Sequence, residues 1–382
     1  MPYYPLYALL FVETGLSDGE ISGLFALWSV TGFVAGVPTG ALADRWSRRG
    51  CLVLAGVLQA GAFALWTAFP VPASFAAGLV VWGVAGALMS GAAEALVYDG
   101  LAAVGAAGSY LRVRGRMSAA ELLVQLPTAL AATVLFALGG YPLVGWASVA
   151  FCLAAATVAL RFPEAPRAAA GEDAGSLRSA LADVLRRPGL RLSALAVALI
   201  GGLDAVEEYF PVVAADRGVP VATVPLAVLG ISLAGAAGAA LAERAGRLPG
   251  RALPAMLALS AAALGTAVVL PAPAALAGVA VFYALYLAVL VVAEARLQDR
   301  IGSARRATVT SVAALGIELS SLVVFGTWAL GGLGAIAVLV LVVVPVTARA
   351  LSHWGAVLSP TESRGRESRG SSSCTSGPMA SA

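Results

Sequence analysis

The chain has 382 residues, of which 60% are hydrophobic and only 12% are charged, and its net charge is +3. No single water-soluble core can bury this much apolar surface, so the composition excludes a soluble globular domain and indicates a membrane protein. Three cysteines without metal-ligand spacing and a single histidine argue against a zinc site, a disulfide framework and histidine-based catalysis.

Twelve membrane helices are predicted from apolar stretches of about 20 residues, the length that spans a bilayer core. Residues 1–161 form an N-terminal bundle and residues 191–352 a C-terminal bundle. The expected helices cover residues 1–13, 19–40, 50–69, 73–98, 116–138 and 141–161 in the first half, and 191–214, 221–242, 252–270, 273–296, 306–329 and 332–351 in the second. Alternating polar residues, as in a membrane barrel, are missing from these stretches.

Two segments depart from this pattern. Residues 1–13 are too short to span a bilayer as a helix, so we expect a truncated first helix or an upstream start outside the given sequence. Residues 162–190 are charged and carry Leu177, Leu181 and Leu185 at helical spacing. This pattern predicts a linker between the bundles that contains a short amphipathic helix.

The positive charges are all arginines, and they lie on one side of the predicted membrane domain. Only Arg217 falls on the other side. Because cationic loops resist translocation, the arginine-rich side is predicted to be cytoplasmic, with both termini there, in the cytoplasmic membrane of a bacterium. Residues 353–382 are rich in Ser, Gly and Arg and are expected to form a disordered cytoplasmic tail.

Two short strings recur about half a chain apart. Ala41–Arg45 (ALADR) is echoed by Ala240–Arg244 (ALAER), and Glu94–Asp99 (EALVYD) by Glu294–Asp299 (EARLQD). Each string falls at the arginine-rich end of corresponding helices. The matching positions predict two six-helix halves related by a parallel repeat.

The segment Gly40–Arg49 (GALADRWSRR) between the second and third helices resembles the major facilitator signature G-x-L-x-D-R-x-G-R-R. Only Ser47 departs, standing in place of a glycine. The resemblance implies an all-α membrane protein with two six-helix bundles related by a pseudo-twofold axis. It also implies a monomeric secondary transporter that moves a small molecule by alternating access.

The same resemblance implies a conformational latch at the arginine-rich end. Gly40 is expected to let two helices approach closely, Asp44 to accept hydrogen bonds at a neighbouring helix N-terminus, and Arg48 to reach an acid on the fourth helix. The predicted latch consists of Gly40, Asp44, Arg45, Arg48, Arg49 and either Glu94 or Asp99. The alternative, that these arginines only set the topology, stays open.

Four acids at membrane depth are candidates for substrate binding or proton coupling, because charge in lipid is costly and requires a role or a partner. Asp204 follows Gly201 and Gly202, which are expected to loosen the helix near mid-membrane, and Glu318 lies beside two serines. Glu121 lies close to Arg114 and Arg116, so an ion pair is equally expected there. Glu207 and its neighbour Glu208 approach the outer surface, where one is expected to face water.

Several functions remain open at this stage. The leading one is proton-coupled efflux of amphipathic or drug-like compounds, although the fifth helix has Pro127 without the glycine-rich pattern of many drug antiporters. Uptake of a sugar, metabolite or siderophore and a non-transporting sensor are the alternatives. A membrane enzyme and an ATP-driven pump are disfavoured, because paired catalytic residues and a G-x-x-x-x-G-K-[ST] string are missing. We expect a small-molecule substrate, protons and lipid as partners, no cofactor and no nucleic acid.

Overall fold

The computed structural model describes residues 1–164, 186, 188–299 and 306–355, and the described residues form helices joined by short loops. The helices are α1 (Tyr7–Glu13), α2 (Asp18–Arg45), α3 (Arg48–Ala68), α4 (Pro72–Ala103), η1 (Ala107–Ser109), α5 (Tyr110–Ala159), α7 (Pro188–Gly202), η2 (Leu203–Tyr209), α8 (Phe210–Asp216), η3 (Val221–Thr223), α9 (Val224–Ala240), α10 (Ala242–Gly246), α11 (Ala252–Val269), α12 (Ala272–Asp299) and α13 (Arg306–Gly355).

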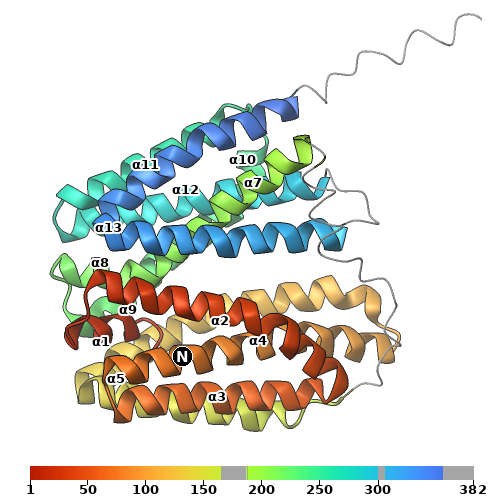
Figure 1. Ribbon diagram of the computed structural model, residues 1–382, viewed down its shortest axis with the longest axis vertical. Coiled ribbons are helices and arrows are strands. Elements are labelled where there is room, and N and C mark those ends of the chain that lie inside the picture. Colours follow the sequence, from red (N-terminus) through yellow and green to blue (C-terminus); the bar gives the residue numbers. More distant parts are fainter. Residues whose placement is uncertain (165–185, 187, 300–305, 356–382) are drawn as a thin grey trace, which may run out of the picture.

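The helices form two bundles that lie side by side. In Figure 1 the first half, α1 to α5, occupies the lower part of the molecule, and the second half, α7 to α13, the upper part. The end where the first half leaves toward residue 164 and the second half begins at α7 is called here the linker end. The opposite end, with the turns before α2, α4, α9 and α12, is the distal end.

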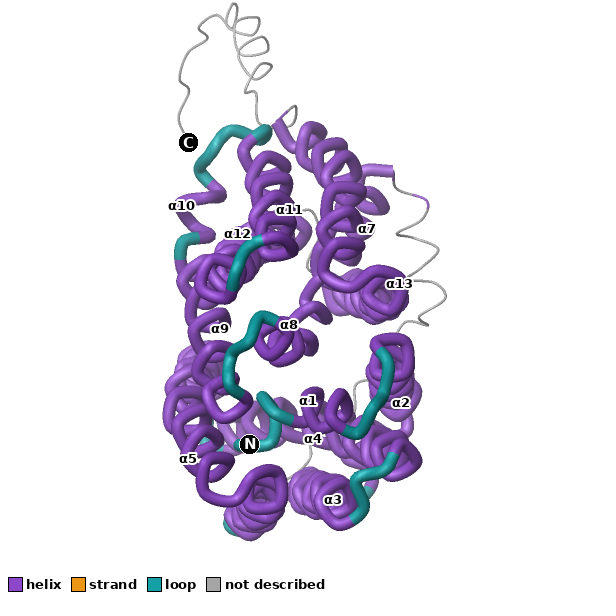
Figure 2. Tube along the Cα trace, turned by 90° about the vertical axis from the view of Figure 1, so that its left-hand side faces the viewer, coloured by secondary structure: helices purple, strands orange, loops and turns teal. Residues whose placement is uncertain are grey.

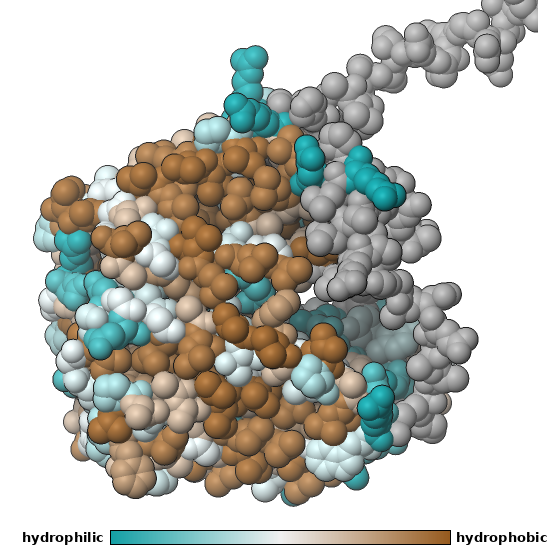
Figure 3. Space-filling view, viewed as in Figure 1, coloured by the Kyte–Doolittle hydropathy of each residue, from teal (hydrophilic) through white to brown (hydrophobic). Residues whose placement is uncertain are grey.

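Long apolar helices and an apolar outer surface identify the molecule as a multi-pass membrane protein. Eight described helices are long and apolar enough to cross a membrane. Hydrophobic residues cover most of the face shown in Figure 3, and hydrophilic ones gather toward the two ends. This distribution is expected where lipid surrounds the middle of a bundle and water its ends.

Two of the longest helices each contain a break. Gly139 and Gly140 interrupt α5, and Gly331 and Gly332 interrupt α13. Each break turns the chain back at the distal end, so that α5 and α13 each provide two antiparallel segments. These segments correspond to the expected helices 116–138 and 141–161 and to 306–329 and 332–351. The total of twelve helices stays a prediction.

The first helix is even shorter than the expected 1–13: α1 covers Tyr7–Glu13 at the distal end, and residues 2–6 before it form turns. It is anchored by aromatic packing, since Tyr7 is only 2% exposed and its ring stacks on Trp66 with centroids 5.8 Å apart. Figure 2, which views the distal end, shows α1 next to α8 at the boundary between the two halves. The first helix therefore contacts the second half directly.

Some predictions fall outside the described residues. These are the amphipathic helix with Leu177, Leu181 and Leu185, and the tail beyond residue 355. The division into bundles 1–161 and 191–352 stays an interpretation that the arrangement in Figure 1 supports.

Candidate functional site

A cavity of 540 Å³ lies between the two halves, a size typical of small-molecule sites. The first half lines it with residues of α2 and α4 and with Tyr4, and the second half with residues of α7, η2, α12 and α13. The lining residues are Tyr4, Trp28, Ser29, Gly32, Phe33, Gly83, Gly86, Ala87, Ser90, Gly201, Asp204, Ala205, Glu207, Glu208, Leu290, Glu294, Ile317, Glu318, Ser321 and Phe325. A recess between the halves is visible toward the linker end in Figure 3.

The cavity is acidic. Five of its described lining residues are carboxylic acids and none is basic. Glu208 is buried and Glu207 is half-buried, whereas Asp204, Glu294 and Glu318 are exposed to the cavity. Carboxylates at membrane depth without fixed cations are costly, so they require protons, water or a cationic ligand. The site is therefore chemically suited to bind protons or organic cations.

The η2 segment brings three of these acids together. The predicted loosening after Gly201 and Gly202 is confirmed, since α7 ends at Gly202 and the chain continues as a 3₁₀ helix over Leu203–Tyr209. In a 3₁₀ helix, residues three apart lie on the same face. Asp204 and Glu207 therefore share one face of η2, with Glu208 beside them.

Four tyrosines donate hydrogen bonds to these acids. From α12, the Tyr283 hydroxyl donates to Glu207 Oε2 at 2.7 Å and to Asp204 Oδ1 at 3.2 Å, and Tyr286 donates to the same Asp204 oxygen at 3.3 Å. These two tyrosines are one helical turn apart, which directs both toward η2.

The other two donors come from the first half. The Tyr4 hydroxyl donates to Glu207 Oε1 at 3.0 Å and to Glu208 Oε1 at 3.1 Å, and Tyr7 donates to Glu208 Oε2. From the sequence alone, the tyrosines of these helices suit a cavity for amphipathic cargo, although packing or an interface position is the favoured interpretation of each one singly. A pair of aromatic residues precedes Pro5 in the first half and Pro211 in the second, which indicates that the two segments correspond.

The remaining two acids of the cavity lie away from this cluster. Glu318 on α13 accepts a hydrogen bond of 2.7 Å from Ser29 of α2, so it joins the two halves. Glu294 lines the cavity from α12. Asp204, Glu207 and Glu318 of the predicted site thus meet in one cavity, and Glu294 and Glu208 join them.

The structure corrects the expected position of Glu207 and Glu208. Both belong to the cluster at the cavity, and Glu208 is only 7% exposed, so neither stands free in outer water. Glu121, in contrast, lies outside the cavity lining. It pairs with Arg114 at 3.7 Å and is 65% exposed. This is the ion pair that the sequence predicted as the alternative to a binding role for Glu121.

The signature segment at the linker end contains the expected ion pair between helices. Arg48 pairs with Asp99 of α4, with Asp44 at 3.7 Å, and donates to the Ala95 carbonyl at 3.1 Å. Glu94 instead pairs with Arg114 at 3.5 Å. Arg48 therefore reaches the fourth helix through Asp99.

Two other expectations for this segment are not met among the described residues. A Cβ added to Gly40 would meet no described atom within 4 Å, so no described helix approaches closely there. Asp44 is 71% exposed and contacts the side chain of Arg48, the first residue of α3, at 3.7 Å rather than accepting a hydrogen bond from a described helix N-terminus. Arg45 is exposed, and Arg49 donates to the Phe162 carbonyl at 3.4 Å.

A different acid caps the nearby helix. Glu164 accepts hydrogen bonds from the Ser47 hydroxyl at 2.7 Å and from the Arg48 backbone N–H at 2.8 Å. Ser47 itself caps α3 by accepting from the Gly50 N–H at 2.8 Å. The serine that departs from the family signature is thus the N-cap residue of α3.

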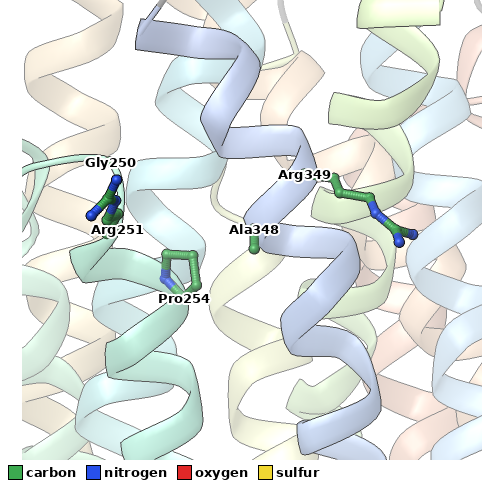
Figure 4. A pocket seen from close by; sticks show the side chains of 5 residues that line it. All are labelled: Gly250, Arg251, Pro254, Ala348 and Arg349. Atoms are coloured by element: carbon green, nitrogen blue, oxygen red, sulfur yellow. The ribbon is translucent and has the colours of Figure 1, made fainter.

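A second pocket of 340 Å³ lies at the linker end, between the start of α11 and the end of α13. It is lined by Gly250, Arg251, Pro254, Ala348 and Arg349. In Figure 4 the Arg251 and Arg349 side chains point away from each other. They do not converge on one ligand position, so the central cavity is the better candidate site.

Two helical bundles around a polar cavity, with an apolar belt outside, define the architecture of a membrane transporter. Residues 1–324 match the family model described as Major Facilitator Superfamily. The chain belongs to this superfamily and is a multi-pass membrane transporter.

Comparison with solved structures shows the same fold at low sequence identity. A mutant form of the nucleoside transporter NupG has a TM-score of 0.69 and 12% identity, with 94% of this chain and 96% of that chain covered. A D-xylose-proton symporter has a TM-score of 0.70 and 15% identity, covering 91% and 92%. A bacterial homologue of the human lysosomal transporter Spinster, inward-facing and unoccupied, has a TM-score of 0.67 and 16% identity, covering 93% and 91%. A comparison with curated protein sequences found no significant match.

Proposed function

We propose that the protein is a proton-coupled secondary transporter that exports small amphipathic organic compounds, cations above all, across a bacterial cytoplasmic membrane. The observation that carries the proposal is the acidic cavity between the halves. Asp204 and Glu207 are assigned to proton binding, because tyrosines from α12 hold them in place. Glu318 and Glu294 are assigned to the cationic group of the cargo.

The aromatic lining supports an amphipathic cargo. Trp28, Phe33 and Phe325 line the same cavity as the acids. Aromatic faces bind apolar groups and attract cations, and the carboxylates supply opposite charge. A compound with an apolar body and a positive charge satisfies both kinds of lining residue.

The orientation belongs to the same proposal. The linker end carries Arg48, Arg114, Arg244 and Arg247, and the distal end carries Arg217, whose guanidinium donates to backbone carbonyls at the end of α11. Because cationic loops stay inside, we place the linker end in the cytoplasm.

Proton-driven uptake of a polar molecule is the second candidate. It is supported by the fold shared with a D-xylose-proton symporter and a nucleoside transporter. The two candidates differ in cargo and in direction. A cavity for a neutral polar solute needs hydrogen-bond donors in its lining. The five acids in the lining favour a cationic cargo over a neutral one.

The test measures efflux of ethidium, a lipophilic cation, and of a neutral lipophilic dye from cells that express the full chain, with and without a protonophore. We expect ethidium efflux that the protonophore abolishes and that falls to the level of cells lacking the protein in the Asp204→Asn variant. The Glu13→Gln variant is the matched control, because Glu13 is an exposed acid bonded to Tyr141 outside the cavity. Well-inserted protein that moves neither dye would contradict the export proposal, and accumulation of sugar or nucleoside would support uptake instead.

A further inference from the structure

The hydrogen bonds of the acid cluster divide by the half that supplies the donor. Asp204 accepts from Tyr283 and Tyr286, which belong to the same half as Asp204 itself. Glu208 accepts from Tyr4 and Tyr7, which belong to the other half. Glu207 accepts one bond from each half.

This division has a consequence for a protein whose halves move as units. If the halves separate on this side of the cavity, the bonds of Asp204 persist, Glu207 loses one of its two tyrosines, and Glu208 loses both. We propose, on the basis of the proposed transport function, that Tyr4 and Tyr7 form with Glu207 and Glu208 a distal latch. This latch closes the distal side of the cavity, with Glu208 as the carboxyl that exchanges its partners in each transport cycle.

The surroundings of the distal latch favour closure. Ser22 of α2 and Tyr209 of η2 form a hydrogen bond of 2.8 Å between their hydroxyls, again across the halves. The Phe25 ring lies 5.3 Å from the Tyr209 ring and 5.8 Å from the Phe325 ring. Polar and aromatic contacts between the halves therefore surround the latch.

Burial makes the latch a two-state element. Tyr7 is 2% exposed and Glu208 is 7% exposed, so water does not compete for their hydrogen bond in this conformation. A buried polar group that loses its partner pays the full desolvation penalty, so a partly open latch is unfavourable. Water entering an open distal side replaces the tyrosine donors, which makes the fully open state accessible.

The test measures the distance between spin labels at the distal end of the full chain in lipid nanodiscs. Labels are attached at Ala68→Cys in the first half and Ala274→Cys in the second, both exposed, after Cys51, Cys152 and Cys374 are replaced by Ala. Opening of the distal end appears as a longer distance. The distance measurement does not depend on transport. It therefore tests the latch separately from the efflux assay, which tests the proposed function.

We expect Tyr7→Phe to raise the ratio of long to short distances by a factor of about ten, because it removes a hydrogen bond to an acidic group. Glu208→Gln is expected to raise this ratio by a similar factor. The double variant should raise it by less than the product of the two single factors, because both substitutions remove the same interaction.

Two matched controls remove tyrosine–acid bonds that lie within one half. Tyr141→Phe removes the bond of 2.9 Å to Glu13, and Tyr286→Phe removes the bond to Asp204. Both are expected to leave the distances unchanged. A Tyr7→Phe distribution equal to that of the controls, or fully multiplicative effects of Tyr7→Phe and Glu208→Gln, would overturn the latch.

Discussion

Gly202 shows how one residue without a side chain positions the acids of the cavity. A Cβ on this residue would lie 2.9 Å from the backbone nitrogen of Ser321 and would overlap the Ser320 side chain. A Cβ on the neighbouring Gly201 would lie 2.7 Å from the Ile317 side chain, which can move, whereas the Gly202 Cβ would meet backbone atoms. The close contact of α7 with α13 thus requires a glycine at position 202, just before the η2 acids.

The Gly202→Ala variant is expected to lower the free energy of unfolding by about 1–3 kcal/mol, because overpacking forces α7 and α13 apart. It should also reduce transport, since η2 follows directly. The measurement is thermal unfolding in detergent together with the efflux assay. Gly230→Ala in α9 is the control, because no atom lies within 4 Å of its added Cβ and its stability should not fall. Equal stability of the two variants would refute the packing argument.

The breaks in α5 and α13 depend on the backbone conformation of one glycine in each helix. Gly140 has φ 60° and ψ −156°, and Gly332 has φ 54° and ψ −142°. Residues with a side chain are strained in this region of backbone space. These two glycines allow each long helix to reverse direction at the distal end within two residues.

Replacement of Gly332 by Ala is expected to cost about 1–3 kcal/mol of stability through backbone strain alone, because no atom lies within 4 Å of the added Cβ. Gly334→Ala tests the same change two residues on, where the added Cβ also meets nothing and φ is not positive. Unfolding curves of both variants decide the point. A Gly334→Ala loss as large as that of Gly332→Ala would show that strain is not the cause.

At the scale of the whole molecule, the arginines divide the structure into two unlike ends. The linker end carries the signature arginines, and the distal end carries Arg217. Such an asymmetry sets the orientation during insertion. With the proposed orientation, the linker end of the cavity meets the cytoplasm and the distal end meets the outside.

The orientation is tested by labelling single cysteines in intact cells with a maleimide that cannot cross membranes. Ala274→Cys at the distal end should react from outside, whereas Ala103→Cys at the linker end should react only after permeabilisation. Both positions are exposed alanines, so reactivity reports the compartment. The reverse pattern would invert the proposed orientation.

Sequence reasoning predicted features that depend on local composition. The bundles, the bond between Arg48 and the fourth helix, and the change of helix form after Gly202 follow from hydropathy, charge spacing and glycine. It misplaced Glu208 because this acid is covered by Tyr4 and Tyr7, which come from the other half of the chain. The 3₁₀ form of η2 also changes the face on which each of its residues lies. Sequence reasoning did not foresee the bond between Tyr7 and Glu208, since the two residues lie in different halves and no local sequence pattern indicates such a contact.

The expectations for Gly40 and Asp44 failed for another reason. The signature names residue types and their spacing, and it does not state which partner each side chain meets. In this structure Glu164 takes the position at the α3 N-terminus. No sequence pattern predicts that contact, because Glu164 is separated from Ser47 by four helical segments.

The contacts between the halves are concentrated around the distal latch, so one half can rotate against the other about the distal end. Helix α2 has 28 residues, which corresponds to a length of about 42 Å. With the distal end as pivot, a rotation of about 10° moves the linker end by about 7 Å, while atoms beside the pivot shift by a small fraction of that. The mouth of the cavity at the linker end can thus widen or narrow by the width of a small molecule while the distal contacts stay intact.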